Sequence, residues 1–240
     1  MHMATPELSI VIPVFNEEPN IRPLVEEIGQ AMPADLGYEV VYVDDGSTDG
    51  TAQCVETLAG ELDMDLRLVR HNQCRGQSAA LVTGVKAARG AWIGTLDGDG
   101  QNVPADLPRL YAMLRQAHAQ DPAAVCIAGI RRRRQDSALK LFSSRVANAV
   151  RQSILNDGVT DTGCGLKVFE RETFLSLPLF DHIHRFIPAM FKAKGKRILV
   201  EDVAHRPRQH GVSKYGMWNR LWIGIADLIG VRWLTRRILR

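Results

Sequence analysis

Several patterns that assign chains to common protein classes are missing from this sequence of 240 residues. Its four cysteines, Cys54, Cys74, Cys126 and Cys164, form no Cys-x-x-Cys pair. No zinc site is therefore indicated, and a reducing compartment is favoured over a disulfide framework. No run of about 20 apolar residues occurs, so no membrane-spanning helix is predicted. No signal peptide is recognisable before the first apolar segment.

The fingerprints of two large nucleotide-binding classes are also missing. The first predicted strand is not followed by Gly-x-Gly-x-x-Gly, and the chain has no Gly-x-x-x-x-Gly-Lys-Ser/Thr loop. These absences argue against dinucleotide-dependent dehydrogenases and phosphate-loop hydrolases. A strong overall charge is lacking too, because the formal net charge is only +3. No global attraction to nucleic acid follows from such a balance.

The remaining composition, 45% hydrophobic and 24% charged, is that of a soluble globular protein. Apolar runs with strand character alternate with helical patterns. The predicted strands cover residues 8–14, 38–43, 65–70 and 91–96. The predicted helices between them cover residues 19–32, 49–62 and 77–89. This alternation predicts right-handed βαβ units, and hence an α/β, Rossmann-like fold with a mostly parallel central sheet flanked by helices.

Polar side chains follow three of the predicted strands at the point where each ends. Glu17 follows the first strand, Asp45 the second, and Asp97 and Asp99 the fourth. The carboxyl ends of parallel strands lie along one edge of a sheet, where ligands bind. Two neighbouring carboxylates repel unless a positive charge lies between them, and oxygen ligands with open positions suit Mg²⁺ or Mn²⁺. We predict a divalent metal at Asp97 and Asp99 with Gln101 as a further ligand; an exposed polar turn is the alternative.

Basic residues gather in the second half of the chain. Residues 131–151 hold seven Lys or Arg against one acid, and residues 206–240 hold eight against one. Arg131 follows an apolar run, so it is expected at a strand end. Arg145 lies off the apolar stripe of a helix predicted at 138–155 and could face a groove. Aromatic residues are not interleaved with these basic residues, which argues against an RNA-binding surface.

The tail, residues 217–240, is predicted to form an amphipathic helix. Large apolar side chains fall on one helical face: Trp218, Leu221, Trp222, Ile225, Leu228, Ile229 and Trp233. Five arginines accompany them. Tryptophan and arginine in this arrangement are typical of a helix that lies in the headgroup layer of an anionic membrane. Packing on the body of the protein, or at the interface of a homo-oligomer, is the alternative.

Several motifs taken together resemble the inverting family 2 glycosyltransferases of the GT-A fold. Four of them lie in the predicted nucleotide-binding half: Pro13–Glu18, Asp44–Thr51, Arg75–Ala80 and Asp97–Gln101. Four more resemble the polyprenyl-phosphate branch, which includes dolichol-phosphate mannose synthase-like enzymes: Ser144–Asn148, Asp161–Gly165, Arg185–Phe186 and His205–Gly216. The resemblance covers residues 8–216.

Two departures from the family pattern qualify this resemblance. Many relatives have Asp-Ala-Asp where this chain has Asp97-Gly98-Asp99, so the ligands are kept and a looser turn is expected. The C-terminal transmembrane helices of some branches are missing as well. The Gln-x-x-Arg-Trp signature of processive synthases is also absent, which favours transfer of a single sugar.

The resemblance implies a role for each matching residue. Asp45 is implied to recognise the nucleobase, with Glu17, Pro13 and Gln77 in the same donor site. The metal and the donor diphosphate are implied to bind at Asp97, Asp99 and Gln101. A further set is implied to contact the acceptor phosphate or the donor diphosphate: Arg131, Arg145, Arg206, Arg208, Ser213 and Lys214. Cys164 and the pair His182 and His184 are interpreted as packing residues.

A phosphate acceptor would simplify the chemistry. Its second pKa is about 6, so it is an anion at neutral pH and needs positioning more than a strong base. Arginine side chains suit that task. An alcohol acceptor would instead need a base, for which Asp157, Asp161 and Asp181 are candidates.

The sequence thus predicts a GT-A glycosyltransferase domain at residues 1–216 and a membrane-surface helix at residues 217–240. The expected reaction transfers one sugar, with inversion, from a nucleoside-diphosphate sugar to a polyprenyl phosphate such as undecaprenyl or dolichyl phosphate. The expected location is cytoplasmic, on the inner face of the cytoplasmic membrane. One alternative is a glycosyltransferase with a soluble or glycan acceptor. Another is a non-catalytic protein that binds a nucleotide sugar or RNA.

Overall fold

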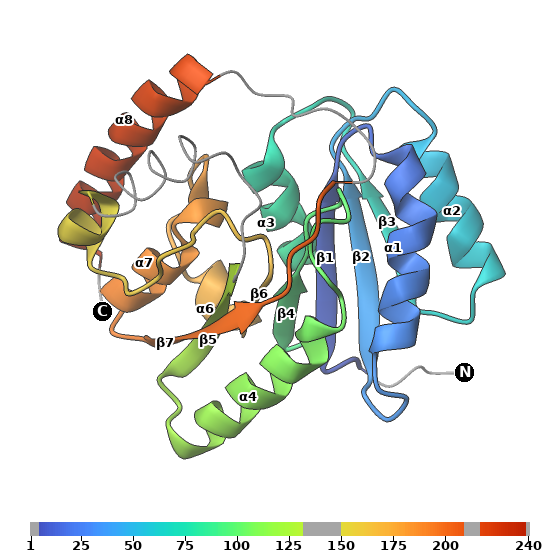
Figure 1. Cartoon of the computed structure of the whole chain (residues 1–240), viewed down its shortest axis with the longest axis horizontal. Helices are drawn as coiled ribbons and strands as arrows, with labels where there is room; N and C mark the ends of the chain where they lie inside the picture. Colours follow the sequence, from blue (N-terminus) through green and yellow to red (C-terminus); the bar gives the residue numbers. More distant parts are fainter. Residues whose placement is uncertain (1–4, 132–149, 209–216, 239–240) are drawn as a thin grey trace.

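A seven-stranded sheet forms the centre of the protein (Figure 1). The computed structural model describes residues 5–131, 150–208 and 217–238. The strands are β1 (Leu8–Val14), β2 (Tyr38–Asp44), β3 (Leu66–Arg70), β4 (Trp92–Thr95), β5 (Ala124–Arg131), β6 (Lys167–Glu170) and β7 (Arg197–Val203). Their order across the sheet is β3-β2-β1-β4-β6-β5-β7. The predicted α/β architecture is confirmed.

One strand of this sheet runs against the others. β1 pairs in parallel with β2 and β4, and β2 in parallel with β3. β6 lies antiparallel between β4 and β5, and β5 pairs in parallel with β7. The chain moves outward from β1 to β3 and then returns to place β4 on the other side of β1. The strand order therefore reverses between β1 and β4, which is where ligands bind in open α/β sheets.

Helices cover both faces of the sheet. Their bounds are α1 (Glu18–Ala31), α2 (Thr51–Glu61), α3 (Gln77–Ala87), α4 (Asp106–Gln120), α6 (Arg171–Leu175), α7 (Ile187–Ala193) and α8 (Met217–Thr235), with a short 3₁₀ turn η1 (Ile183–Arg185). Helices α1, α2 and α4 share one apolar core with strand residues such as Ile10 and Tyr42. Helices α3, α6 and α7 share the other with Val11 and Val41, because successive strand residues point to opposite faces.

The predicted helix at residues 49–62 begins later than expected. Asp49 precedes α2, and its Oδ1 accepts hydrogen bonds from the backbone N–H of Thr51 (3.0 Å) and from its hydroxyl (2.5 Å). A short carboxylate satisfies free N–H groups better from just outside a helix than from within it. Asp49 therefore ends the turn instead of occupying the first helical turn.

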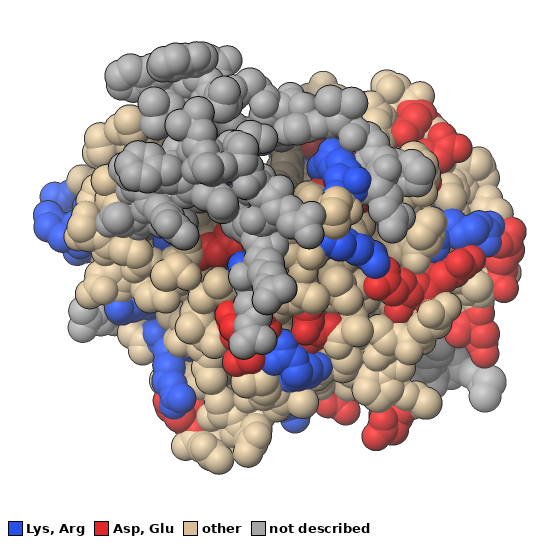
Figure 2. Space-filling view, in the orientation of Figure 1, with Lys and Arg blue, Asp and Glu red and all other residues tan. Residues whose placement is uncertain are grey.

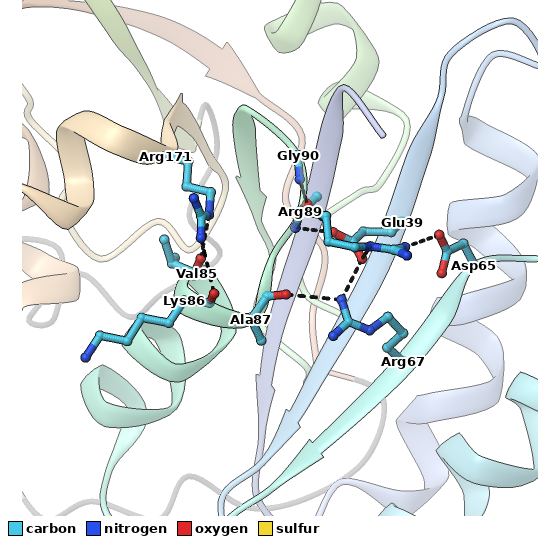
Figure 3. A network of polar contacts seen from close by, with 10 residues as sticks. Glu39, Asp65, Arg67, Val85, Lys86, Ala87, Arg89, Gly90 and Arg171 are labelled. Carbon is cyan, nitrogen blue, oxygen red and sulfur yellow. Dashed lines mark hydrogen bonds and ion pairs between the residues drawn. The ribbon is translucent and has the colours of Figure 1, made fainter. Parts of the chain in front are cut away.

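A buried carboxylate ties together the strand ends far from the ligand edge (Figure 3). Glu39, at the start of β2, is fully buried. It accepts hydrogen bonds from the Ser9 hydroxyl (2.6 Å), from the Arg67 guanidinium (2.9 Å) and from Arg89 through both backbone and side chain. Burial alone would raise the pKa of Glu39, but these donors and the arginine charges lower it overall. The network links β1, β2, β3 and the end of α3.

Helix α8 packs against the body along one side only. Val231 is buried, and Leu228 and Leu234 pack beside it in the α3-side core. Ile225, Ile229 and Trp233 point outward and are 42%, 66% and 59% exposed. Leu228 thus lies inward of the predicted outer face. In the described segments, none of the helices combines the length and apolar character that crossing a bilayer requires.

Charge on the visible face is mixed. Figure 2 shows Lys and Arg side chains interspersed with Asp and Glu among the described residues of that face. This distribution agrees with the small net charge of the whole chain.

Candidate functional site

A cavity of about 330 Å³ opens where the strand order reverses between β1 and β4. Its walls come from the carboxyl ends of β1, β2 and β4 and from the start of β6 and the η1 turn. Seven residues that the sequence assigned to the donor site or the basic set line it: Pro13, Glu17, Asp45, Gln77, Asp97, Asp99 and Arg208. The fold therefore gathers these distant residues around one recess.

The turn that carries Asp97 and Asp99 is fixed by side-chain contacts. The backbone N–H of Asp97 donates to Oδ1 of Asn102 (2.9 Å), and the N–H of Gln101 donates to Oδ1 of Asp99 (3.1 Å). The amide of Gln77, at the start of α3, donates to Oδ1 of Asp97 (3.1 Å). Asn102 is 2% exposed. The two carboxylates are thus held at the cavity by both flanking segments.

The electrostatic state of this turn favours a cation. Burial, and next the negative charge of Asp99, raise the pKa of Asp97 to about 6, against the opposing charges of Lys167 and Arg131. Among the described residues no group of three or more His, Cys, Asp or Glu could hold a metal ion. Two carboxylates with open positions fit Mg²⁺ or Mn²⁺, which bind few protein ligands and take further oxygens from water and phosphate.

Two glycines leave the room that this turn needs. A Cβ at Gly165 would overlap the carboxylate of Asp97, and a Cβ at Gly98 would overlap the side chain of Val14. Gly98 is buried against the end of β1. The expected looser turn is therefore wrong, because Gly98 permits a close approach of β4 to β1. Gly165 forms a cradle for Asp97.

Asp45 differs from Asp97 because neighbouring groups of the protein already supply hydrogen bonds to both oxygens of its carboxylate. Oδ1 accepts from the N–H of Arg75 (2.9 Å) and contacts Nδ1 of His71 (2.7 Å); Oδ2 accepts from the N–H of Gly76 (2.7 Å) and the thiol of Cys74 (3.3 Å). Burial would raise its pKa, but these donors lower it overall. Asp45 therefore shapes the loop at residues 71–76 and lines the cavity. Its contact with a nucleobase stays a prediction.

Glu17 and Pro13 lie at the same end of the cavity. Glu17 accepts a hydrogen bond from the Asn20 side chain (2.7 Å), and its N–H donates to the Thr51 hydroxyl (2.9 Å). Asn16 accepts from the N–H of Thr48 (2.8 Å), which joins the loop after β1 to the loop after β2. These contacts form the wall predicted for the nucleoside.

The predicted basic residues are mostly ion-paired. Oδ2 of Asp99 accepts from Arg208 at 2.6 Å. Both oxygens of Asp161 accept from Arg131, at 2.6 and 2.7 Å. The chain after β7 returns to the turn that carries Asp97 and Asp99, where the Arg206 N–H donates to the Gln101 carbonyl oxygen (3.1 Å).

Three of the described predicted residues lie outside the cavity lining: Gln101, Arg131 and Arg206. The Arg206 guanidinium points to both oxygens of Glu27 on α1, at 3.1 and 2.5 Å. The Gln101 amide donates to the Arg206 carbonyl oxygen at 3.5 Å. Their implied roles stay predictions. Arg145, Ser213 and Lys214 lie outside the described residues.

Sequence reasoning missed several residues that build the site. Lys167 is 4% exposed and lines the cavity, and His71 is 8% exposed and orients Asp45. His184, interpreted as a packing residue, also lines the cavity, with Nδ1 2.8 Å from the hydroxyl of Ser78. A lysine within the strand-like run Leu166–Phe169 was the one available signal. Cys164 is buried, which agrees with its packing interpretation.

Comparison with solved structures supports this fold. A mannosyltransferase from Pyrobaculum calidifontis, solved with GDP-Man and Mn²⁺, is 23% identical with a TM-score of 0.65 over 99% of this chain and 66% of that chain. Glucosyl-3-phosphoglycerate synthase from Mycobacterium tuberculosis, solved with Mn²⁺, UDP-glucose and phosphoglyceric acid, is 16% identical with a TM-score of 0.66 over 98% of this chain and 81% of that chain. At such identities the likeness concerns the fold alone.

Sequence identity to characterised proteins is higher than to these solved structures. A dodecaprenyl-phosphate galacturonate synthase from Rhizobium johnstonii is 37% identical over 234 residues, 96% of this chain and 68% of that protein. An undecaprenyl-phosphate 4-deoxy-4-formamido-L-arabinose transferase from Aeromonas hydrophila is 32% identical over 211 residues, 88% of this chain and 63% of that protein. This chain thus spans about two thirds of the length of these relatives.

The family assignment rests on the match to a family model. The model described as glycosyl transferase family 2 matches residues 9–177. That range includes β1 to β6 and the cavity-lining turns after β1, β2 and β4. The match agrees with the resemblance seen in the motifs and with the observed fold. The chain belongs to glycosyl transferase family 2.

Proposed function

We propose that this protein transfers a single sugar, with inversion, from a nucleoside-diphosphate sugar to a polyprenyl phosphate at a membrane surface. The observation that carries the proposal is the cavity, in which the Asp45 and Glu17 wall and the Asp97 and Asp99 turn face a single recess. The sequence relatives named for sugar transfer to dodecaprenyl or undecaprenyl phosphate support the acceptor class.

The donor would lie with its nucleoside towards Asp45 and its diphosphate towards the metal turn. Asp97 and Asp99 would hold Mg²⁺ or Mn²⁺, which supplies electrostatic stabilisation of charge on the leaving diphosphate. The Gln77 amide, 3.1 Å from Asp97, keeps that carboxylate oriented. Arg208, which contacts Asp99, would contribute a second positive charge beside the donor diphosphate.

The acceptor phosphate would attack the anomeric carbon from the face opposite the diphosphate. A phosphate oxygen then forms the new bond while the bond to the nucleoside diphosphate breaks, and the configuration inverts. The acceptor is already an anion near neutral pH, so the protein has to position it and screen its repulsion from the donor. We assign this screening to Arg131 and Arg145. Arg131 is oriented by its two-point contact with Asp161.

Access to a lipid acceptor would come through α8. Ile225, Ile229 and Trp233 form an outward apolar stripe, and the guanidinium of Arg237 lies 4.8 Å from the Trp233 ring centroid. A helix with this composition binds the headgroup layer of an anionic bilayer. We infer attachment at the inner face of the cytoplasmic membrane, where nucleotide sugars are available.

One experiment tests the reaction. The protein is incubated with Mn²⁺, undecaprenyl phosphate and a panel of labelled nucleoside-diphosphate sugars, and the label is partitioned between organic solvent and water. Label in the organic phase that disappears in Asp99→Asn supports the proposal. Label only in a soluble product contradicts the lipid acceptor, and binding without turnover contradicts catalysis.

A second experiment tests the membrane contact. Full-length protein is floated with anionic liposomes, and the variant Ile229→Ser/Trp233→Ser serves as the comparison. We expect the wild-type chain to float and the variant to remain behind. A wild-type chain that stays with the unbound fraction would remove the membrane-surface part of the proposal.

A further inference from the structure

The cavity wall beside the acidic turn, at the start of β6 and on η1, carries two cations that differ from the three predicted arginines. Arg131, Arg206 and Arg208 each pair with a carboxylate. Lys167 and Arg185 also line the cavity, but among the described residues neither has a carboxylate within ion-pair distance. The difference separates cations that the fold itself uses from cations that it leaves available.

Lys167 is the more deeply buried of the two. It stands at the first position of β6, is 4% exposed, and donates to the carbonyl oxygen of Cys164. An ammonium group has three donors, and among the described residues this one has one hydrogen-bond acceptor and the charge of Asp97 nearby. Once a metal neutralises Asp97, the Lys167 ammonium is available to an anion that enters the cavity.

His184, which lies on η1 beside Arg185, adds no charge to this wall. His184 lies close enough to both Lys167 and Arg185 that their charges, after burial, lower its pKa, to about 3. The His184 ring is therefore uncharged at neutral pH, with Nδ1 beside the Ser78 hydroxyl at 2.8 Å. A neutral ring adds a hydrogen-bonding edge without adding charge. The wall thus offers two positive charges and an imidazole to a single ligand.

We propose that Lys167 and Arg185, together with His184, form a subsite that binds an oxyanion of the substrates other than the donor diphosphate. The inference rests on the proposed function, in which Asp97 and Asp99 hold the metal that neutralises the donor diphosphate. Two groups supply the required chemistry. One is the carboxylate of a uronic-acid donor sugar, and the other is the phosphate of the acceptor.

Binding measurements separate these two sources without requiring turnover. Calorimetry with Mn²⁺ uses the matched pairs UDP-galactose and UDP-galacturonate, and GDP-mannose and GDP-mannuronate, with farnesyl phosphate as the acceptor probe. Lys167→Met should weaken binding of one class about tenfold to a hundredfold, the scale of a hydrogen bond to a charged group. A loss confined to the uronates identifies the sugar carboxylate, and a loss confined to farnesyl phosphate identifies the acceptor.

Three variants keep the interpretation sharp. Lys167→Arg should restore most of the lost affinity, and Arg185→Gln should weaken the same probe as Lys167→Met. Lys192→Met is the matched control, because the Lys192 ammonium also donates to a carbonyl oxygen but lies outside this cavity. Arg185→Gln also carries the test if Lys167→Met does not fold, as judged by thermal melting.

Two results would overturn the subsite. One is unchanged binding of every probe by both variants, or binding of no probe to any protein. The other is equal weakening of Mn²⁺, UDP and all nucleotide sugars, which would mean that Lys167 acts only through Asp97. Loss of transfer with normal subsite binding would contradict the proposed function and leave the subsite intact.

Discussion

The ends of β2 and β4 both present a carboxylate to the same cavity, but the surroundings shift the pKa values of the two carboxylates in opposite directions. Asp45, after β2, is held by four donors from residues 71–76, and its pKa is lowered. Asp97, after β4, is contacted by the amide of Gln77, and its pKa is raised to about 6. The first carboxylate is satisfied by the fold, and the second is left with unmet charge.

This contrast separates shape from chemistry. A satisfied carboxylate fixes a loop, so its value is structural even when it lines a ligand site. When burial and a neighbouring acid disfavour the ionised form of a carboxylate, binding of a cation beside it stabilises that form. The β4 end should therefore govern metal binding and turnover, while the β2 end should govern the stability and shape of the nucleoside wall.

The largest expected effect comes from Asp97→Asn. Removing one carboxylate from the metal turn should lower transfer by about 10²–10³-fold, the scale for loss of a preorganised electrostatic group. In EDTA the same variant should be at least as stable as the wild-type protein, because a repelled charge is gone. Initial rates of organic-phase labelling and melting temperatures measure the two effects. Asp35→Asn, a change at an exposed acid, should alter neither rate nor melting. A stability loss in Asp97→Asn would contradict the contrast.

Gly165→Ala should produce the next effect without changing any charge. The added Cβ would overlap the Asp97 carboxylate, so the carboxylate must move and we expect transfer to fall about tenfold or more. Titration of Mn²⁺ against activity should show a higher midpoint. Gly60→Ala is the matched control, because a Cβ at that helical position meets nothing within 4 Å. An unchanged Mn²⁺ midpoint in Gly165→Ala would contradict the proposed cradle.

Asp45→Asn should instead destabilise the fold. An amide cannot accept all four hydrogen bonds, and the donors left behind are partly buried, so we expect a loss of about 1–3 kcal/mol in the free energy of unfolding. Urea denaturation in EDTA measures it, with Asp97→Asn as the internal comparison. If Asp45→Asn abolishes donor binding while leaving stability untouched, its role is recognition and the contrast between the two strand ends fails.

The smallest effect on stability is expected for Glu39→Gln. Its dependence on pH gives a further test of how a satisfied carboxylate behaves. The folded-state pKa of Glu39 lies below the ordinary value of 4.5, so its stabilisation is fully present above that value and is lost as pH falls through the folded pKa. We expect Glu39→Gln to cost about 1 kcal/mol at pH 7, since its arginine partners are partly exposed. Urea titrations from pH 7 to 3 should show this difference shrinking below pH 4.5. A difference that grows towards low pH would have the wrong sign.

The first half of the fold could be predicted from the sequence because its signals are local. The strands β1 to β4 are apolar runs that end at polar turns, and the intervening helices have clear periodicity, so both elements and site edge follow. The motif resemblance placed Asp45, Asp97 and Asp99 in one site, and the structure puts all three around the cavity.

The second half could not be predicted in the same way. β6 is only four residues long and begins with a lysine, and β7 carries charged residues at Glu201 and Asp202, so the sequence pattern gives only a weak strand signal for either. Their pairing with β4 and β5 is a long-range property that local sequence does not encode. For the same reason the roles of Lys167 and Gly165 could not be predicted, since these roles depend on the residues that they face across the sheet.

The reversed direction of β6 has a consequence for how such a protein can diversify. β5 runs towards the ligand edge and ends at Arg131, and β6 starts from that edge at Lys167. Both anchor points of the chain between them therefore lie at the ligand edge of the sheet, and the Arg131–Asp161 pair joins the two sides. Replacements at its described cavity-lining residues, 162–165, would alter the cavity wall and leave the β1–β4 half untouched. Such a protein can therefore keep the β1–β4 half of its cavity constant while the segment between β5 and β6 varies.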